Sequence, residues 1–183
     1  MNIYDAQSLL NVLCSKVRLL REDLPSIDGI SDLPSGAAFW SADYACLLLW
    51  PITEVGLLSF KESAALAQDF LDGVLSEREG RRKHADGYLI FAFNEKPKGE
   101  LDAAVRALEL STNICRKNVI WPEPGRISLE WSRISDISVL GLPDIVVECS
   151  EKLTWPRMSE EVKALWLEVD GIVDRKEKET NGR

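Results

Sequence analysis

A continuous apolar run in the middle of the chain predicts a strand that is buried on both faces. Residues 87–93 have the sequence Gly-Tyr-Leu-Ile-Phe-Ala-Phe, a length typical of a strand and too short for a free-standing helix. A turn at residues 94–99 separates this run from an amphipathic helix that begins at Glu100, where apolar side chains recur at helical spacing. The apolar face of this helix comprises Leu101, Ala104, Val105, Leu108 and Ile114. Residues 116–122 return to a strand pattern, and we expect Pro122 to end it because proline has no backbone N–H for the ladder.

Two further amphipathic helices and a second strand precede this region. Apolar positions at i, i+3 and i+4 predict a helix over about residues 3–21 and another over about residues 61–78, with Ser59 as a candidate N-cap. Between these helices lies a second apolar run, residues 44–50, which we interpret as a buried strand ended by Pro51. An apolar run of this length is also compatible with a helix, because periodicity alone does not separate the two.

The alternation of strand, helix, strand, helix and strand predicts an α/β (or α+β) fold, with a small mixed sheet of about four to five strands flanked by amphipathic helices. Residues 126–131 alternate apolar and polar side chains, as in a half-buried strand, and residues 144–148 are another strand candidate. The spacing of apolar residues then predicts a C-terminal amphipathic helix. We expect a single α/β domain at residues 1–158, this helix at residues 159–174 and a disordered charged tail at residues 175–183.

The composition favours a globular protein that binds other proteins. The chain has 183 residues, of which 45% are apolar and 28% are charged, as in ordinary globular domains. Its net charge of -8 repels a phosphate backbone unless a local basic patch outweighs it, so a protein partner is expected before a nucleic acid. No apolar stretch reaches membrane-spanning length, and Asp5 stands where a signal peptide needs basic residues. We therefore expect a cytoplasmic protein with no membrane contact.

The residues that usually carry catalysis or bind metals are few and scattered. The cysteines lie far apart in apolar segments, so we expect buried free thiols in a reducing compartment; they are Cys14, Cys46, Cys115 and Cys149. The single histidine, His84, lies in a charged turn and is expected to be solvated. The glycines form no phosphate-binding motif, and no Cys or His spacing is typical of a metal site. The residues therefore predict no catalytic, cofactor or metal site.

One segment partly matches a nuclease motif. In PD-(D/E)-x-K nucleases, acidic residues on adjacent strands hold a divalent metal beside a lysine, and Asp144, Glu148 and Lys152 resemble that set. In the motif the lysine follows the second acid by two residues, which places both on one side of the strand. Here Lys152 follows Glu148 by four residues, so the spacing does not fit. A small metal-dependent nuclease is the alternative function.

Two groups of residues are candidates for a partner interface. A charged turn carries a cluster of cations that is either solvated or contacts phosphate or an acidic partner. This cluster comprises Arg78, Arg81, Arg82, Lys83 and His84. The chain also has six tryptophans, a residue type enriched at the centres of interfaces. We expect most of them to pack in the core, and Trp155 and Trp166 are the best candidates to face a partner.

The central segments resemble a family of bacterial defence proteins. The order Asp86-Gly87-Tyr88-Leu89-Ile90, a helix, and then Cys115-Arg116-Lys117-Asn118-Val119-Ile120 is similar to the middle component of three-component conflict systems built around an ABC-type ATPase, the Lamassu-like group. Arg116 and Lys117 match the Arg-Lys pair that opens a strand in that family, and residues 140–143 match its later segment rich in leucine and proline. The similarity covers about residues 40–145. The pair is also explained as protection of a strand edge against aggregation.

The resemblance implies a non-catalytic accessory subunit for antiviral defence. Such an adaptor joins an SMC- or Rad50-like ATPase subunit to an effector nuclease subunit in anti-phage or anti-plasmid immunity, contacts DNA only within the complex and holds no cofactor. The interface candidates are Trp155, Trp166, Arg81, Arg82, Lys83, Arg116 and Lys117. Two hypotheses remain beside it: the nuclease above, and a stand-alone regulatory module for a small ligand, for which the sequence offers no specific polar constellation.

Overall fold

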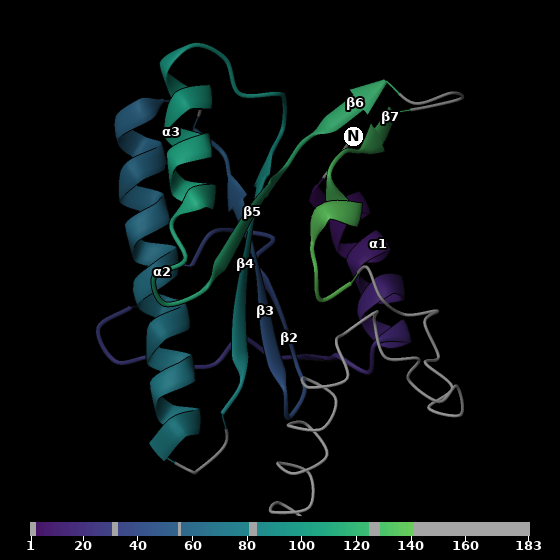
Figure 1. Ribbon diagram of the computed structural model, residues 1–183, viewed down its shortest axis with the longest axis vertical. Coiled ribbons are helices and arrows are strands. Elements are labelled where there is room, and N and C mark those ends of the chain that lie inside the picture. The colour runs from purple at the N-terminus through teal and green to yellow at the C-terminus, as the bar shows by residue number, and fades with distance from the viewer. Residues whose placement is uncertain (1–2, 31–32, 55, 81–83, 125–128, 141–183) are drawn as a thin grey trace, which may run out of the picture. The chain divides into compact units, whose positions relative to one another are not determined.

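The described part of the chain folds around one five-stranded mixed sheet (Figure 1). A computed structural model describes residues 3–30, 33–54, 56–80, 84–124 and 129–140. The helices are α1 (Ile3–Lys16), α2 (Leu57–Gly80) and α3 (Glu100–Leu110). The sheet has the order β1-β2-β3-β4-β5 and consists of β1 (Leu20–Glu22), β2 (Ala38–Ser41), β3 (Ala45–Ile52), β4 (Asp86–Phe93) and β5 (Arg116–Ile120). The predicted α/β class is confirmed.

The three central and late strands of the sheet are parallel, and its early strands are antiparallel. β3 pairs with β4 and β4 with β5 in parallel, whereas β1, β2 and β3 pair antiparallel. The connections β3-α2-β4 and β4-α3-β5 each cross over the sheet, and the strand order advances in one direction. Two such crossovers of the same hand place their helices on the same face. Figure 1 shows α2 and α3 together on one face and α1 on the other.

The side chains of the central strands alternate between two hydrophobic cores. On the α2 and α3 side, Cys46, Leu48 and Trp50 of β3 meet Leu89, Phe91 and Phe93 of β4. On the α1 side, Ala45, Leu47 and Leu49 of β3 meet Tyr88, Ile90 and Ala92 of β4. Every residue of β3 and all but the first of β4 are buried. This burial on both faces explains the unbroken apolar runs, and it confirms the strand interpretation of residues 44–50 over the helical one.

The first helix is shorter than its apolar pattern predicts. The prediction extended it to Arg21, but α1 ends at Lys16. The Leu19 N–H donates to the Cys14 carbonyl (2.9 Å) and the Arg18 N–H to the Ser15 carbonyl (3.2 Å), with Arg18 at φ 61°. These bonds form a Schellman motif, which usually places glycine at the left-handed position. Because this position holds arginine and not glycine, the sequence carries no signal for the end of the helix. Residues 20–22 form β1 instead of continuing the helix.

The second helix and the strand before it also differ from their predicted bounds. α2 begins at Leu57, so Ser59 lies inside its first turn and is not the N-cap; its hydroxyl donates to the Gly56 carbonyl (3.2 Å). β3 continues through Pro51 to Ile52. β2 pairs with β3 only as far as Leu49. Pro51 lies beyond the paired residues, so its lack of a backbone N–H removes no hydrogen bond between β2 and β3.

The segments around β5 differ in a similar way. α3 ends at Leu110, and Ile114 is 48% exposed instead of part of the helical face. β5 ends at Ile120, and Pro122 opens a new strand, β6 (Pro122–Pro124), which pairs antiparallel with β7 (Leu129–Trp131). A 3-10 turn, η1 (Ile134–Asp136), follows. Within the predicted strand at residues 126–131, the described residues are those of β7.

The later predictions fall on parts of the chain that the structure does not describe. They are the strand at residues 144–148, the domain boundary at residue 158, the helix at residues 159–174 and the tail at residues 175–183. Contacts divide the chain into residues 1–145 and residues 146–183, and all described residues belong to the first unit.

We predict that Gly87 is required for the close packing of α2 on β4. A Cβ atom at this position would lie 2.8 Å from Leu75 Cδ1 and 2.9 Å from Cys115 Cβ, so Gly87→Ala forces packed groups apart. We expect it to lower the free energy of unfolding in urea by about 1–3 kcal/mol. The matched control is Gly80→Ala, where no atom lies within 4 Å and the change is expected to stay within about 0.5 kcal/mol. Equal effects of the two substitutions would contradict the prediction.

Candidate functional site

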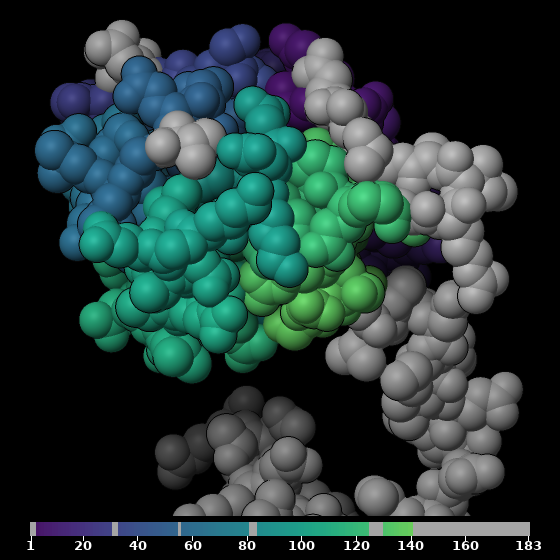
Figure 2. Space-filling view, turned by 90° about the horizontal axis from the view of Figure 1, so that it is seen from above, coloured from purple at the N-terminus to yellow at the C-terminus, as the bar shows by residue number. Residues whose placement is uncertain are grey.

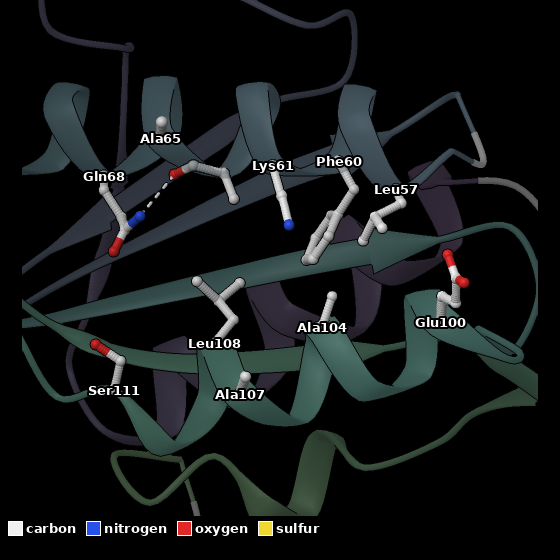
Figure 3. Close-up of a pocket in the computed structure, with 11 residues that line it drawn as sticks. Leu57, Phe60, Lys61, Ala65, Gln68, Glu100, Ala104, Ala107, Leu108 and Ser111 are labelled. Atoms are coloured by element: carbon white, nitrogen blue, oxygen red, sulfur yellow. Dashed lines mark hydrogen bonds between the residues drawn. The ribbon is translucent and has the colours of Figure 1, made fainter.

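An open groove lies between α2 and α3 on the helical face of the described chain (Figure 3). It has a volume of about 590 Å³. Its residues come from both helices at intervals of three and four, so each helix presents one continuous stripe to it. The groove is lined by Leu57, Phe60, Lys61, Ala64, Ala65, Gln68, Glu100, Ala104, Ala107, Leu108 and Ser111.

The floor of this α2/α3 groove belongs to the hydrophobic core. Phe60 is 2% exposed, and its ring packs against those of Phe91 and Phe93 of β4 with centroid distances of 5.8 and 5.4 Å. Four alanines, Ala64 and Ala65 on α2 and Ala104 and Ala107 on α3, lie along the walls. Because alanine has only a Cβ, two helices meeting at alanines leave room that larger residues would fill. The groove therefore has walls of small side chains above a floor of packed aromatic rings.

The polar side chains of the groove lie apart from one another. Figure 3 shows Gln68 and Ser111 at one end, Glu100 at the other and Lys61 between them. The Gln68 amide already donates to the Ala64 carbonyl (3.1 Å). No catalytic arrangement of nucleophile and base is present among these residues.

The charge of the two helices is predominantly acidic. α2 contains five acidic and two basic residues, and α3 contains three acidic residues and one basic residue. Of the three basic residues, Arg106 pairs with Asp102 on the next turn (2.9 Å), and Arg78 donates to the Ala42 carbonyl (2.8 Å) and the Ser41 hydroxyl (2.6 Å). Lys61 is the basic residue that lines the groove.

Two strongly exposed leucines lie on the helices that form the groove. Leu110 is 84% exposed and Leu58 is 71% exposed, the two highest values among the large apolar residues described. Leu58 follows Leu57, which lines one end of the groove, and Leu110 precedes Ser111, which lines the other. Neither leucine lines the groove itself, but exposed apolar side chains on these helices are typical of a surface that contacts another protein.

A second, smaller hollow lies where β3 and β4 end and α2 and α3 begin, the end of the molecule seen in Figure 2. It measures about 370 Å³, and its charged residues are Glu95, Lys96, Lys98 and Glu100. Lys96 Nζ lies 3.6 Å from Glu123 Oε1 and over the Trp121 ring, 5.6 Å from its centroid. A hydrogen bond from the Trp121 indole (2.8 Å) lowers the pKa of Glu123, and Lys96 adds to the effect. Two acidic and two basic residues line this hollow, so it has no concentrated charge of one sign.

The Arg-Lys pair that opens β5 has two different environments. Arg116 is exposed; its guanidinium lies over the Tyr88 ring at 5.6 Å, and Nη1 donates to the Ser138 hydroxyl (3.2 Å). Lys117 is 3% exposed, and its ammonium donates to three carbonyls, those of Ser111 (3.0 Å), Asn113 (2.8 Å) and Cys115 (3.3 Å). Arg116 is therefore accessible to a partner, whereas Lys117 holds the loop between α3 and β5 within the chain.

The outer edge of β5 is protected by an ion pair. Glu109 accepts a hydrogen bond from the Val119 N–H (2.8 Å), and Arg133 donates to the Val119 carbonyl (3.2 Å). Arg133 and Glu109 also pair with each other at 3.0 Å. These side chains occupy the backbone groups that another strand would need at this position. Edge protection therefore comes from Glu109 and Arg133, in addition to the charges of Arg116.

Most of the remaining interface candidates are not among the described residues. Arg81, Arg82, Lys83, Trp155 and Trp166 all lie outside them, as do Asp144, Glu148 and Lys152 of the partial nuclease motif. Within the charged turn, the side chain of His84 is 85% exposed and its Nδ1 lies 4.0 Å from Glu79 Oε1, so its predicted solvation is confirmed. Arg78 is instead fixed to the turn between β2 and β3.

The described tryptophans and cysteines are structural. Trp40, Trp50, Trp121 and Trp131 are all buried, as expected for core packing. The three described cysteines are buried free thiols, and burial raises their pKa, to about 12 for Cys14 and about 11 for Cys115. Within the described ranges, no group of three or more His, Cys, Asp or Glu side chains is placed to hold a metal ion.

We predict that Lys117 stabilises the fold through its ammonium group. Lys117→Met keeps much of the side-chain length but leaves three loop carbonyls without their donor, and we expect a loss of about 1–3 kcal/mol in the free energy of unfolding. Chemical denaturation measures this loss. Lys98→Met, at an exposed position, is the control and should change stability by less than about 0.5 kcal/mol. An unchanged stability in Lys117→Met would show that the three hydrogen bonds contribute nothing net.

We also predict that the described thiols are unreactive in the folded chain. Thiolates are the reactive form, and the raised pKa values keep Cys14 and Cys115 protonated at pH 8. The test uses a Cys149→Ser chain, in which the remaining thiols are those of Cys14, Cys46 and Cys115. A disulfide reagent at pH 8 should label almost none of these thiols in the folded chain and all three in urea. Rapid labelling of the folded chain would contradict this burial.

The groove was not predicted from the sequence, although a signal for it exists. The apolar pattern placed Ala104 on the apolar face of its helix and assigned Ala65 and Ala107 to no face, and these two exposed alanines line the groove. No described helix is both long and apolar enough to span a bilayer.

Comparisons with known proteins identify no relative: no family model, no curated protein and no solved structure matches this chain.

Proposed function

We propose that this chain is a non-catalytic adaptor subunit of a bacterial anti-phage or anti-plasmid defence complex. It bridges an SMC- or Rad50-like ATPase subunit and an effector nuclease subunit in the cytoplasm. In this proposal the α2/α3 groove is the docking surface, and a helix of one of these partners occupies it. The second partner binds elsewhere on the chain, and exposed Arg116 is a candidate contact for it.

The groove is the single observation that carries the proposal. It combines a volume of about 590 Å³, alanine walls and a floor formed by buried Phe60. Binding a helix in a hydrophobic groove is a recurrent mode of protein recognition, in which side chains at i, i+3, i+4 and i+7 enter the groove. The most exposed leucines of the described chain, Leu58 and Leu110, lie on the same two helices, although neither lines the groove.

The test is co-purification of the chain with the ATPase and nuclease subunits encoded beside it. We expect the parent chain to co-elute with at least one of them and Ala107→Arg to lose that partner, because a long charged side chain would occupy the groove. Ala103→Arg is the matched control: it lies on the same helix, is also exposed and does not line the groove, so co-elution should persist.

Three outcomes would contradict the adaptor function. The first is a chain that co-elutes with neither subunit, and the second is a partner retained equally by Ala107→Arg and Ala103→Arg. The third is cleavage of DNA by the purified chain with magnesium or manganese that is lost in Asp144→Ala, because that result identifies the nuclease alternative. Thermal unfolding of each variant before the assay confirms that a lost partner does not reflect a lost fold.

A further inference from the structure

We infer that the occupant of the α2/α3 groove is a basic amphipathic helix of about three turns. This inference rests on the proposed function and adds the chemistry of the partner to it. It is drawn from the length of the groove, the size of its wall residues and the charge around it.

The length of the groove sets the length of the helix. The residues of α3 that line it run from Glu100 to Ser111, and those of α2 run from Leu57 to Gln68. Each stripe spans eleven residue steps, or about 16 Å at 1.5 Å per residue. A helix lying along the groove therefore makes contact over about three turns, presenting one apolar residue or pair of residues per turn.

The size of the wall residues sets what enters the groove. Ala64, Ala65, Ala104 and Ala107 leave space between the two helices, while Leu57 and Leu108 narrow it from opposite walls. Small residues on the receiving side allow large residues on the entering side, because packed interiors tolerate few voids. The entering face should therefore carry leucine, isoleucine, methionine or phenylalanine at i, i+4, i+7 and i+11.

The charge of the two helices sets the sign of the occupant, because the lining residues themselves include one acid, Glu100, and one base, Lys61. α2 and α3 together carry eight acidic residues and three basic ones, and the acidic residues remain in excess after Asp102 is paired with Arg106 and Glu109 with Arg133. An approaching helix therefore meets a negative field, which favours lysine and arginine on its outward and flanking positions. Lys61 is the one basic side chain among the residues that line the groove. Replacing it with an acidic residue therefore tests whether the groove prefers a basic helix.

The same argument separates an external partner from the chain's own C-terminal segment. Residues 159–174 have apolar positions at helical spacing, but they carry five acidic residues and one basic residue. An acidic helix is repelled where a basic helix is attracted. A second copy of the chain has the same disadvantage, because its net charge is also -8. A basic partner is the occupant that the charge favours.

Three synthetic peptides test the inference on the full chain. One peptide of about 15 residues, a length at which isolated helices become marginally stable, has leucines on one face and lysines elsewhere. The second replaces every lysine by glutamate, and a third shuffles the basic sequence so that its leucines share no face. We expect fluorescence anisotropy to show the basic amphipathic peptide binding at least tenfold more tightly than the other two, with an affinity that falls as salt rises.

Variants of the chain assign the binding to the groove. Ala107→Arg should weaken binding of the basic peptide at least tenfold, and Ala103→Arg should leave it unchanged. Lys61→Glu should tighten it by about two- to fivefold, the size of effect expected for one partly exposed charge. Glu100→Lys should weaken it by a similar factor. Opposite responses to the two charge reversals support a basic occupant, since a change of stability alone would move both in the same direction.

Four results would overturn the inference. The first is equal binding of the acidic and basic peptides, and the second is a shuffled peptide that binds as tightly as the amphipathic one. The third is an affinity for the basic peptide that Ala107→Arg does not alter. The fourth is a full-length Trp166→Asp chain that binds the basic peptide much more tightly than the parent chain. The last result would show that residues 159–174 compete for the groove. If the peptide tests fail but the chain still co-elutes with a partner, the proposed adaptor function stands and only the basic helix is rejected. If the peptide binds but no partner co-elutes, the adaptor function is rejected and the groove remains a binding site.

Discussion

The fold depends on two adjacent strands that have no face in contact with water. Every residue of β3 and residues 87–93 of β4 are buried, so the centre of the sheet is stable only with a layer on each side. α1 covers one face with Leu140, Ile137 and Ile134, and α2 and α3 share the other. The α2/α3 groove follows from this constraint. Two helices must lie side by side on one sheet face, and where alanines meet between them the layer stays open to solvent.

The edges of the sheet restrict the ways in which another protein can bind. Glu109 and Arg133 occupy the outward N–H and carbonyl of Val119, and their side chains are only 16% and 31% exposed. A charge pair in this position is more effective than one on an open surface, because it also satisfies backbone groups. The opposite edge is β1, which has only three residues and offers a short template for strand addition. With both edges limited, addition of a strand is disfavoured, and the helical face offers the α2/α3 groove instead.

Sequence patterns predicted the elements that are governed by burial and missed those governed by single backbone or side-chain contacts. The apolar runs of β3 and β4 identified a doubly covered sheet because burial on both faces leaves no polar positions. The end of α1 was missed because Arg18 takes the left-handed conformation for which glycine is the usual signal. The role of Lys117 was also missed, since no local pattern shows that its ammonium reaches three carbonyls of the preceding loop. The groove depends on which exposed alanines face each other across two helices, and that requires the packing of one helix against the other.

The shape and polarity of the groove favour a helix over a small ligand. Sites for small molecules bury most of the ligand and direct a few polar groups to one point within an apolar enclosure. Here Glu100 lies at one end and Ser111 at the other, and the Gln68 amide is already bonded to the Ala64 carbonyl. Lys61 lies between the two ends, so the polar groups do not converge on one point to fix the orientation of a compact molecule. An extended apolar partner needs no such fixed point, because repeated contacts along about three turns define its position. In the proposed complex, the excess of acidic residues on α2 and α3 selects among apolar helices by charge.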